Sequence, residues 1–206
     1  TATGRAALRW VYGTNHPDAD GPDYWQRECE LAKDWPGIAV DEWIPSPVKE
    51  TEAWVAEGLT AGRKKHPDTF IAVWVTDPTP TLARLAKAGV VDLVIVQGYT
   101  HAAPRYGKHA TLHWTTALKR CEMAKELGIE AKSIFSFGHI TADKNAAGET
   151  LDVEQLAERA EEIKEKFPDM PGVAFFEDDS DDSPELRQIV QACDEVSRKL
   201  WPDPSG

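Results

Sequence analysis

The chain has 206 residues, of which 41% are hydrophobic and 28% charged, as in a soluble globular protein with a sizeable core. Its formal net charge of −12 at pH 7 argues against nucleic acid and anionic membrane surfaces as partners. No apolar run approaches the ~20 residues that span a bilayer. A neutral or cationic ligand is compatible with this charge.

Three cysteines and eight tryptophans stand out in the composition. Cys29, Cys121 and Cys193 lie far apart in helical patterns, with no metal-ligand spacing, and their odd number argues against a disulfide framework. We therefore expect ordinary helix residues. Trp43 and Trp74 fall in or at the end of expected strands, where an aromatic face suits stacking on a sugar ring. The alternative is that both fill the core.

Short apolar runs alternate with amphipathic segments along the whole chain. In chain order, we expect strands over 7–13, 37–43, 70–75, 90–96, 131–137 and 172–176. Helices are expected to follow them over 22–33, from 46 or 51 to 65, and over 79–88, 112–127, 152–167 and 183–200. Gly89 and Gly128 are expected to end two of these helices.

Strict alternation of apolar strands and helices predicts an α/β fold with parallel strands and right-handed crossovers. No glycine-rich phosphate loop follows a strand, which disfavours an open nucleotide-binding sheet. Polar residues at several strand ends favour a (β/α) TIM-type barrel instead. A full barrel has eight units in about 250 residues, so about six units predict a short or incomplete barrel. We expect it to form a single domain over 1–206.

An incomplete barrel has consequences for assembly. Either the first two units lie outside this chain, or the sheet is open on one side. An open edge would have to be covered, for example by another copy of the chain, so a homo-oligomer is a candidate assembly.

Two adjacent carboxylates end the apolar run at 37–43. Asp41 and Glu42 follow three apolar residues, and charge at the end of a buried strand is favourable only where that end opens onto water or a ligand. In parallel α/β folds the carboxyl ends of strands form the sites. Asp41 and Glu42 are therefore the first catalytic candidates. The alternative is a solvated pair that caps the next loop.

Three runs at strand ends resemble the chitinase-like barrels of glycoside hydrolase family 18. WPGIAVDEWIP at 35–45 resembles the fourth-strand signature of that family, a D-G-I-D-I-D-W-E-Y-P type of run that ends in the acid. IVQGY at 95–99 lies where the family has its sixth-strand M-x-Y run, and GVAFFEDD at 172–179 resembles its eighth strand. Order and spacing fit strands three to eight of such a barrel.

The resemblance has departures. The family has Asp-x-Glu where this chain has adjacent Asp41 and Glu42, and Pro36 and Ala39 stand near the upstream aspartates of the motif. The adjacent pair is closer to the spherulin-4-like barrels of glycoside hydrolase family 135. The resemblance implies hydrolysis of a glycosidic bond in a polysaccharide, with Glu42 as general acid and no cofactor. Such a function makes a secreted or periplasmic location an expectation.

Asp41 and Glu42 receive different roles. Adjacent residues of a regular strand point to opposite sides, so both cannot face the barrel axis. Glu42 is then the acid, and Asp41 orients it or raises its pKa by like-charge proximity. Glu177, within the acidic run 177–182, is a candidate second carboxylate, although a solvated acidic loop is the simpler interpretation.

The other candidates would bind the sugar. Tyr99 and Gln97 are two residues apart and share one side of their strand, so hydroxyl and amide can hold an N-acetyl or hydroxyl group; Tyr99 is also grouped with the catalytic residues. A core tyrosine is the alternative. His101 and His139 just past strand ends can act as acid–base groups near neutral pH, or be plain loop residues. Trp74 is a candidate stacking platform.

Two other classes of function remain open. Asp41, Glu42, His139 and Glu177 could ring a divalent metal at a barrel mouth, as in a metal-dependent hydrolase, although no His-x-His pair lies on a strand. A barrel that binds sugar without cleaving it is the other alternative, because the acid motif is not the standard one. We expect no metal.

Overall fold

The protein is described by a computed structural model over residues 8–11, 21–32, 35–43, 49–101, 111–140, 144, 147–177 and 183–202. Nine residues inside these elements are described by their backbone alone: Trp10, Glu42, Lys49, Glu50, Thr51, His139, Ile140, Phe176 and Glu177.

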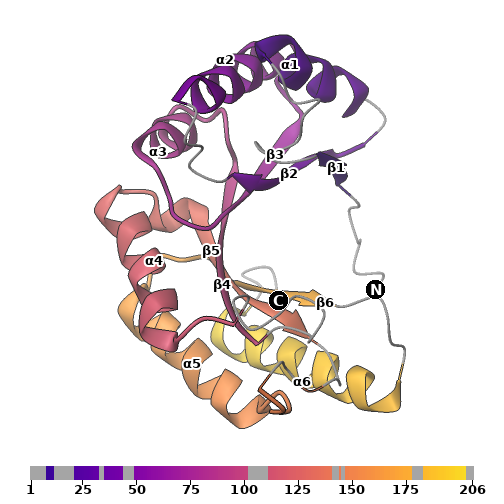
Figure 1. The fold of residues 1–206 in the computed structure, drawn as a ribbon, viewed down its shortest axis with the longest axis vertical. Helices are drawn as coiled ribbons and strands as arrows, with labels where there is room; N and C mark the ends of the chain where they lie inside the picture. Colours follow the sequence, from indigo (N-terminus) through magenta and orange to yellow (C-terminus); the bar gives the residue numbers. More distant parts are fainter. Residues whose placement is uncertain are drawn as a thin grey trace. The chain divides into compact units, whose positions relative to one another are not determined.

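Within the described residues, six strands alternate with six α-helices (Figure 1). The strands are β1 (Arg9–Val11), β2 (Gly37–Trp43), β3 (Phe70–Val75), β4 (Leu93–His101), β5 (Ser133–Ile140) and β6 (Val173–Glu177). The helices are α1 (Pro22–Leu31), α2 (Lys49–Lys65), α3 (Pro80–Lys87), α4 (Trp114–Glu126), α5 (Val153–Lys166) and α6 (Pro184–Leu200), with a 3₁₀ turn, η4 (Glu130–Lys132), before β5. The predicted alternation is confirmed.

The hydrogen-bonded strand order is β1-β2-β3-β4-β5-β6, the same as the order in sequence. β1 pairs with β2, β2 with β3 and β5 with β6, each in parallel. A doubly wound sheet would reverse its strand order at a switch point. Sequential parallel order without a reversal is instead the order of a (β/α) barrel.

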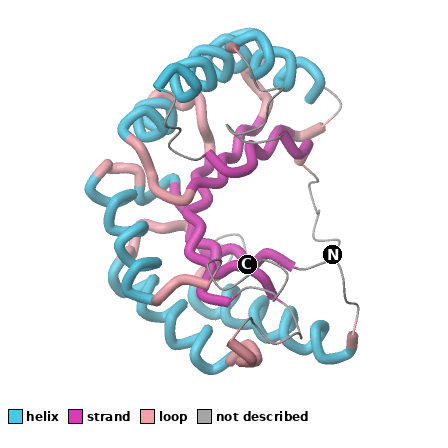
Figure 2. Tube along the Cα trace, viewed as in Figure 1, coloured by secondary structure: helices cyan, strands magenta, loops and turns pink. Residues whose placement is uncertain are grey.

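The chain divides into two compact units, Thr1–Ile95 and Val96–Gly206. In each unit the helices lie along one side of the strands (Figures 1 and 2). The expectation of one domain over 1–206 stays a prediction.

The first unit buries aliphatic strand residues beneath α1, α2 and α3. Ile38, Val40 and Val73 have no exposed surface. The carboxylate of Asp92 accepts a hydrogen bond from the backbone N–H of Ile71 at 2.8 Å and pairs with the guanidinium of Arg63. This contact ties α2 and the start of β3 to the residue that precedes β4.

The second unit has an aromatic core between its strands and helices. Phe137 of β5 stacks on Trp114 of α4 with ring centroids 6.1 Å apart, and on Phe175 of β6 at 5.5 Å. Phe135 lies edge-on to Phe137 at 4.8 Å. Leu156 of α5 belongs to the same buried cluster. These rings hold β5 and β6 against the helices behind them.

β4 and β5 reach several residues further toward their carboxyl ends than predicted. β4 was expected over 90–96 but runs from Leu93 to His101, because the buried valines at 90 and 91 belong to the turn after α3. β5 was expected over 131–137 but runs from Ser133 to Ile140 after η4. His101 and His139 therefore lie in strands, and their predicted loop position is wrong.

The cysteines are free and buried in helices, which confirms their prediction. Burial raises the pKa of the Cys29 thiol to about 11 and that of Cys193 to about 12. Burial also raises the pKa of Cys121. All three are neutral, unreactive thiols near pH 7.

Candidate functional site

The carboxyl end of β2 carries Asp41 and Glu42 and is not a regular strand. Val40 is opposite Val73, and Trp43 is opposite Val75, so β2 advances by three residues while β3 advances by two. This irregularity is a β-bulge, which changes the direction of side chains and is common beside active sites. Because β2 is not a regular strand here, Asp41 and Glu42 need not point to opposite sides.

Asp41 is half-buried at this bulge. The side chain of Glu42 lies outside the described residues, so its predicted role as the acid stays a prediction. The backbone of both residues belongs to β2. The bulge makes the backbone at this strand end differ from that of a regular strand.

Trp43 is fully buried. Its indole N–H donates a hydrogen bond of 3.2 Å to the carboxylate of Glu52 in α2, and the hydroxyl of Thr79 donates to the same carboxylate oxygen. Thr79 also caps α3, because its hydroxyl accepts from the Leu82 N–H at 3.2 Å. The ring exposes no face in this structure, which fits the core alternative and not sugar stacking. Trp43 instead joins the end of β2 to α2 and α3.

Trp74 of β3 is half-buried, between the fully buried Val73 and Val75. Its neighbours point to the core, so its ring lies on the other side of the strand. That position is compatible with a platform, and the role stays a prediction.

The carboxyl end of β4 packs closely on β5. Gly98 has no room for a side chain, because a Cβ there would lie 2.0 Å from the ring of Phe135. Gly138 has a φ of +102°, and a Cβ there would lie 2.8 Å from the carbonyl oxygen of His101 and 2.9 Å from the Cα of Tyr99. Glycines at both positions therefore bring the ends of β4 and β5 together.

The predicted sugar-binding residues of β4 differ in exposure. Gln97 is 4% exposed, and its carbonyl oxygen accepts a hydrogen bond of 2.6 Å from Arg120 of α4. Tyr99 is half-buried, and its carbonyl accepts from the Leu112 N–H at 2.7 Å. His101 is 5% exposed. Only Tyr99 of these three has a substantial open surface.

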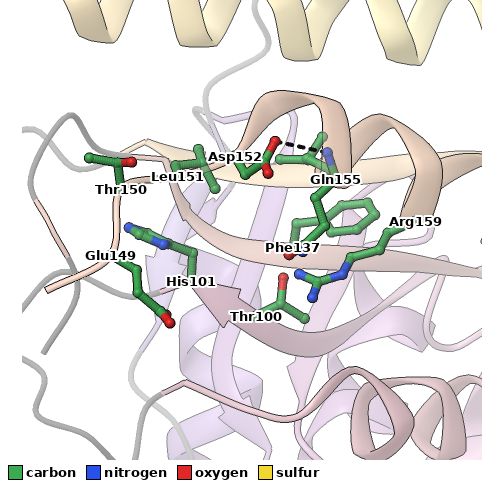
Figure 3. Close-up of a pocket in the computed structure, with 10 residues that line it drawn as sticks. Thr100, His101, Phe137, Glu149, Thr150, Leu151, Asp152, Gln155 and Arg159 are labelled. Carbon is green, nitrogen blue, oxygen red and sulfur yellow. Dashed lines mark hydrogen bonds between the residues drawn. The ribbon is translucent and has the colours of Figure 1, made fainter. Parts of the chain in front are cut away.

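A cavity of about 280 Å³ lies in the second unit beside the end of β4 (Figure 3). Its lining comes from the ends of β4 and β5, the segment before α5, and the first two turns of α5. The lining residues are Thr100, His101, Phe137, Glu149, Thr150, Leu151, Asp152, Gln155, Leu156 and Arg159. Of the predicted site residues, the structure places His101 in this wall.

Arg159 was not among the predicted site residues. Its guanidinium lies over the ring of Trp114, 5.3 Å from the ring centroid. Burial lowers the pKa of this guanidinium below its ordinary value. The indole N–H of Trp114 donates to Glu162 at 2.6 Å. The spacing of residues 152, 155, 156 and 159 on one helix face was the only sequence signal for this wall.

The remaining predicted residues are only partly described. The side chains of His139 and Glu177 lie outside the described residues, although their backbones end β5 and β6. The side chains of three of the four residues of the alternative metal site are therefore not described. In the described part of the chain, no group of three His, Cys, Asp or Glu side chains could hold a metal ion. None of the described helices has the length and apolar character needed to cross a membrane.

Solved structures with this fold include two chitinases. A chitinase from Bacteroides thetaiotaomicron superposes with a TM-score of 0.67 at 12% identity, over 96% of this chain and 76% of its own. Active domain 2 of a chitinase from Pyrococcus furiosus superposes with a TM-score of 0.60 at 11% identity, over 94% of this chain and 74% of its own. The predicted fold, a short TIM-type (β/α) barrel, is confirmed by these likenesses and the strand order.

The same fold is also found in a protein with other chemistry. A sialic acid aldolase from Ruminococcus gnavus superposes with a TM-score of 0.52 at 15% identity, over 91% of this chain and 58% of its own. No protein-family model matches the chain, and no curated protein matches it. At these identities the likeness shows the fold alone, so function must be argued from the site.

Proposed function

We propose that this protein hydrolyses a glycosidic bond in a polysaccharide, with Glu42 as general acid and Asp41 as its supporting carboxylate. The observation that carries the proposal is the position of this pair at a bulge on the carboxyl end of β2. In (β/α) barrels the chemistry is placed at that edge. Two chitinases have this fold, which favours a sugar substrate.

The proposed chemistry needs one protonated and one ionised group. A general acid protonates the leaving oxygen, while a carboxylate or a substrate group stabilises the oxocarbenium-like transition state. In this proposal Asp41, the immediate neighbour of Glu42, orients the acid or raises its pKa by like-charge proximity.

The other strand ends supply binding groups in this proposal. The hydroxyl of Tyr99, a half-buried residue, is proposed to hold an N-acetyl or hydroxyl group of the sugar, and Glu177 is the candidate second carboxylate. Trp74 is the candidate stacking platform. His101 is in the cavity wall, where a sugar unit bound beside β4 would contact it.

The test compares Glu42→Gln with the parent on soluble oligosaccharides, beginning with those of chitin. The amide has the shape of the acid but no proton to donate, so kcat should fall about 10²–10⁴-fold while sugar binding persists. Glu57→Gln is the matched control, because Glu57 is exposed on α2 and should leave kcat unchanged. Undiminished turnover by Glu42→Gln, on a substrate the parent cleaves, would end the hydrolase proposal.

A barrel that binds sugar without cleaving it is the second candidate. Two residues after Asp41, where the Asp-x-Glu spacing would put the glutamate, the chain has Trp43, which is fully buried and bonded to Glu52. Saturable binding of oligosaccharides by the parent, with no cleavage across a broad panel, would favour this candidate. Loss of activity on chelation would instead favour the metal alternative.

A further inference from the structure

The guanidinium of Arg159 is the least satisfied charged group of the cavity beside β4. Among the described residues it has no hydrogen-bonded or ion-paired partner, and it makes a cation–π contact with the face of Trp114. The carboxylates of Asp152 and Glu162 favour its charge from a distance without pairing with it. A half-buried guanidinium has five N–H donors to satisfy, and it matches a carboxylate in a planar, bidentate arrangement.

The guanidinium is directed into the cavity. Figure 3 shows it reaching from α5 toward the side of Thr100 and Phe137. Glu162, which lies one turn further along α5, is already engaged by Trp114 at 2.6 Å and by Lys166 at 2.7 Å. The guanidinium of Arg159 is therefore available to a ligand that enters the cavity.

The cavity has the size and lining for one sugar residue. Its volume of about 280 Å³ lies just below the usual range of small-molecule sites, about 300–1,000 Å³. Phe137 and Leu156 provide an apolar wall, while Thr100 and Gln155 provide a hydroxyl and an amide. Such a lining suits a ring with hydroxyl groups on it.

The charges of the lining favour a monoanion over a dianionic phosphate group. Glu149 and Asp152 are exposed carboxylates that line the same cavity as Arg159. The two carboxylates repel any anion, but they repel a dianion about twice as strongly as a monoanion, which the guanidinium can pair with directly. They can instead accept hydrogen bonds from sugar hydroxyls.

We infer that this cavity is a subsite for a carboxylate-bearing sugar residue, a uronic acid unit, whose carboxylate is held by Arg159. This rests on the proposed function for the identity of the ligand as a sugar. It extends that function by assigning an acidic polysaccharide as the substrate class.

The test uses two ligands that differ only in the carboxylate: methyl β-D-glucuronide and methyl β-D-glucoside. NMR titration of the parent should give a dissociation constant about tenfold or more lower for the glucuronide, as expected for a charge-assisted pair. Arg159→Gln should abolish that difference. Arg198→Gln is the matched control, because Arg198 is exposed on α6 and paired with Asp194, and it should keep the difference.

Folding of each variant is checked by its melting temperature. If Arg159→Gln does not fold, Arg159→Lys keeps the charge but loses the bidentate geometry, and it should weaken glucuronide binding several-fold. Equal affinity of the parent for both ligands, or an undiminished difference in the Arg159 variants, would overturn the inference. Displacement of the glucuronide by inorganic phosphate at equal concentration would overturn the assignment to a carboxylate.

Failure of the subsite and failure of the hydrolase proposal are distinguishable. If Glu42→Gln abolishes cleavage while Arg159→Gln leaves ligand preference intact, only the subsite assignment fails. If no glycoside is cleaved but Arg159 controls glucuronide binding, the subsite stands and the hydrolase proposal fails.

Discussion

Gly98→Ala tests how closely the carboxyl end of β4 packs on β5. The new methyl group would lie 2.0 Å and 2.1 Å from two ring atoms of Phe135, whereas ordinary contacts are 3.4–4 Å. The ring cannot easily move, because Trp114 and Phe137 lie edge-on to it at 5.8 and 4.8 Å. Overpacking of this kind costs about 1–3 kcal/mol, and alanine regains about 0.5–1 kcal/mol over glycine inside a strand.

The expected net loss is about 1–2 kcal/mol, which lowers the melting temperature by about 2–8 °C in a protein of this size. Urea and thermal unfolding followed by circular dichroism measure it. Gly172→Ala is the matched control, because a Cβ at Gly172 meets nothing within 4 Å and should change stability by less than about 0.5 kcal/mol. If Gly98→Ala is as stable as the parent, the ring of Phe135 does not lie over β4 as described.

A double variant sharpens the result. Phe135→Leu makes room at Gly98, so the combined loss of Gly98→Ala and Phe135→Leu should be smaller than the sum of the single losses by at least about 0.5 kcal/mol. Strict additivity would indicate that the two positions do not touch.

Three further predictions concern burial and charge. Trp43→Phe should lower the free energy of unfolding by about 1–3 kcal/mol, because it leaves a cavity and removes the N–H that donates to a glutamate of α2; unchanged urea midpoints would contradict this. The three thiols should react with Ellman's reagent only on unfolding, since burial raises their pKa values, that of Cys29 to about 11; fast labelling of the native protein would refute their burial. Glu162→Gln should cost about 0.5–1 kcal/mol at pH 7, because hydrogen bonds from Lys166 and Trp114 lower the pKa of this carboxyl. A lowered pKa stabilises the fold above the unfolded-state value near 4.5, so that cost should shrink as the pH falls below it; a cost that does not change between pH 7 and pH 3.5 would refute the assignment.

The order of strands and helices could be predicted because each element is signalled by residues close together in the sequence. β2 and β3 occupy the predicted ranges 37–43 and 70–75 exactly as bounded by their apolar runs and flanking prolines and glycines. Thr79, Asp152 and Ser183 cap α3, α5 and α6, each accepting a hydrogen bond from a backbone N–H three residues later. Such caps depend on residues a few positions apart, so they can be recognised in the sequence.

The strand ends were harder to predict because they depend on contacts between distant residues. The apolar run ends at Val96, yet β4 continues through the polar and glycine residues that follow to His101. Gly98 is there because the ring of Phe135, far along the chain, occupies the space beside it.

Arg159 and the bulge in β2 could not be predicted for the same reason, because each depends on contacts between residues that are far apart in the sequence. Arg159 is one charged residue among many in α5, and only the packing of Trp114 and the cavity wall distinguishes it. The bulge is a property of how β2 pairs with β3.

The central claim is that the carboxylates at the end of β2 act on a glycosidic bond. A crystal structure of Glu42→Gln with a bound oligosaccharide tests it most directly. We expect the amide of residue 42 within about 2.6–3.2 Å of a glycosidic oxygen, with a second carboxylate about 5 Å from it for retention or about 6.5–9.5 Å for inversion. A sugar bound away from β2, or residue 42 directed toward the helices with no sugar beside it, would contradict the account.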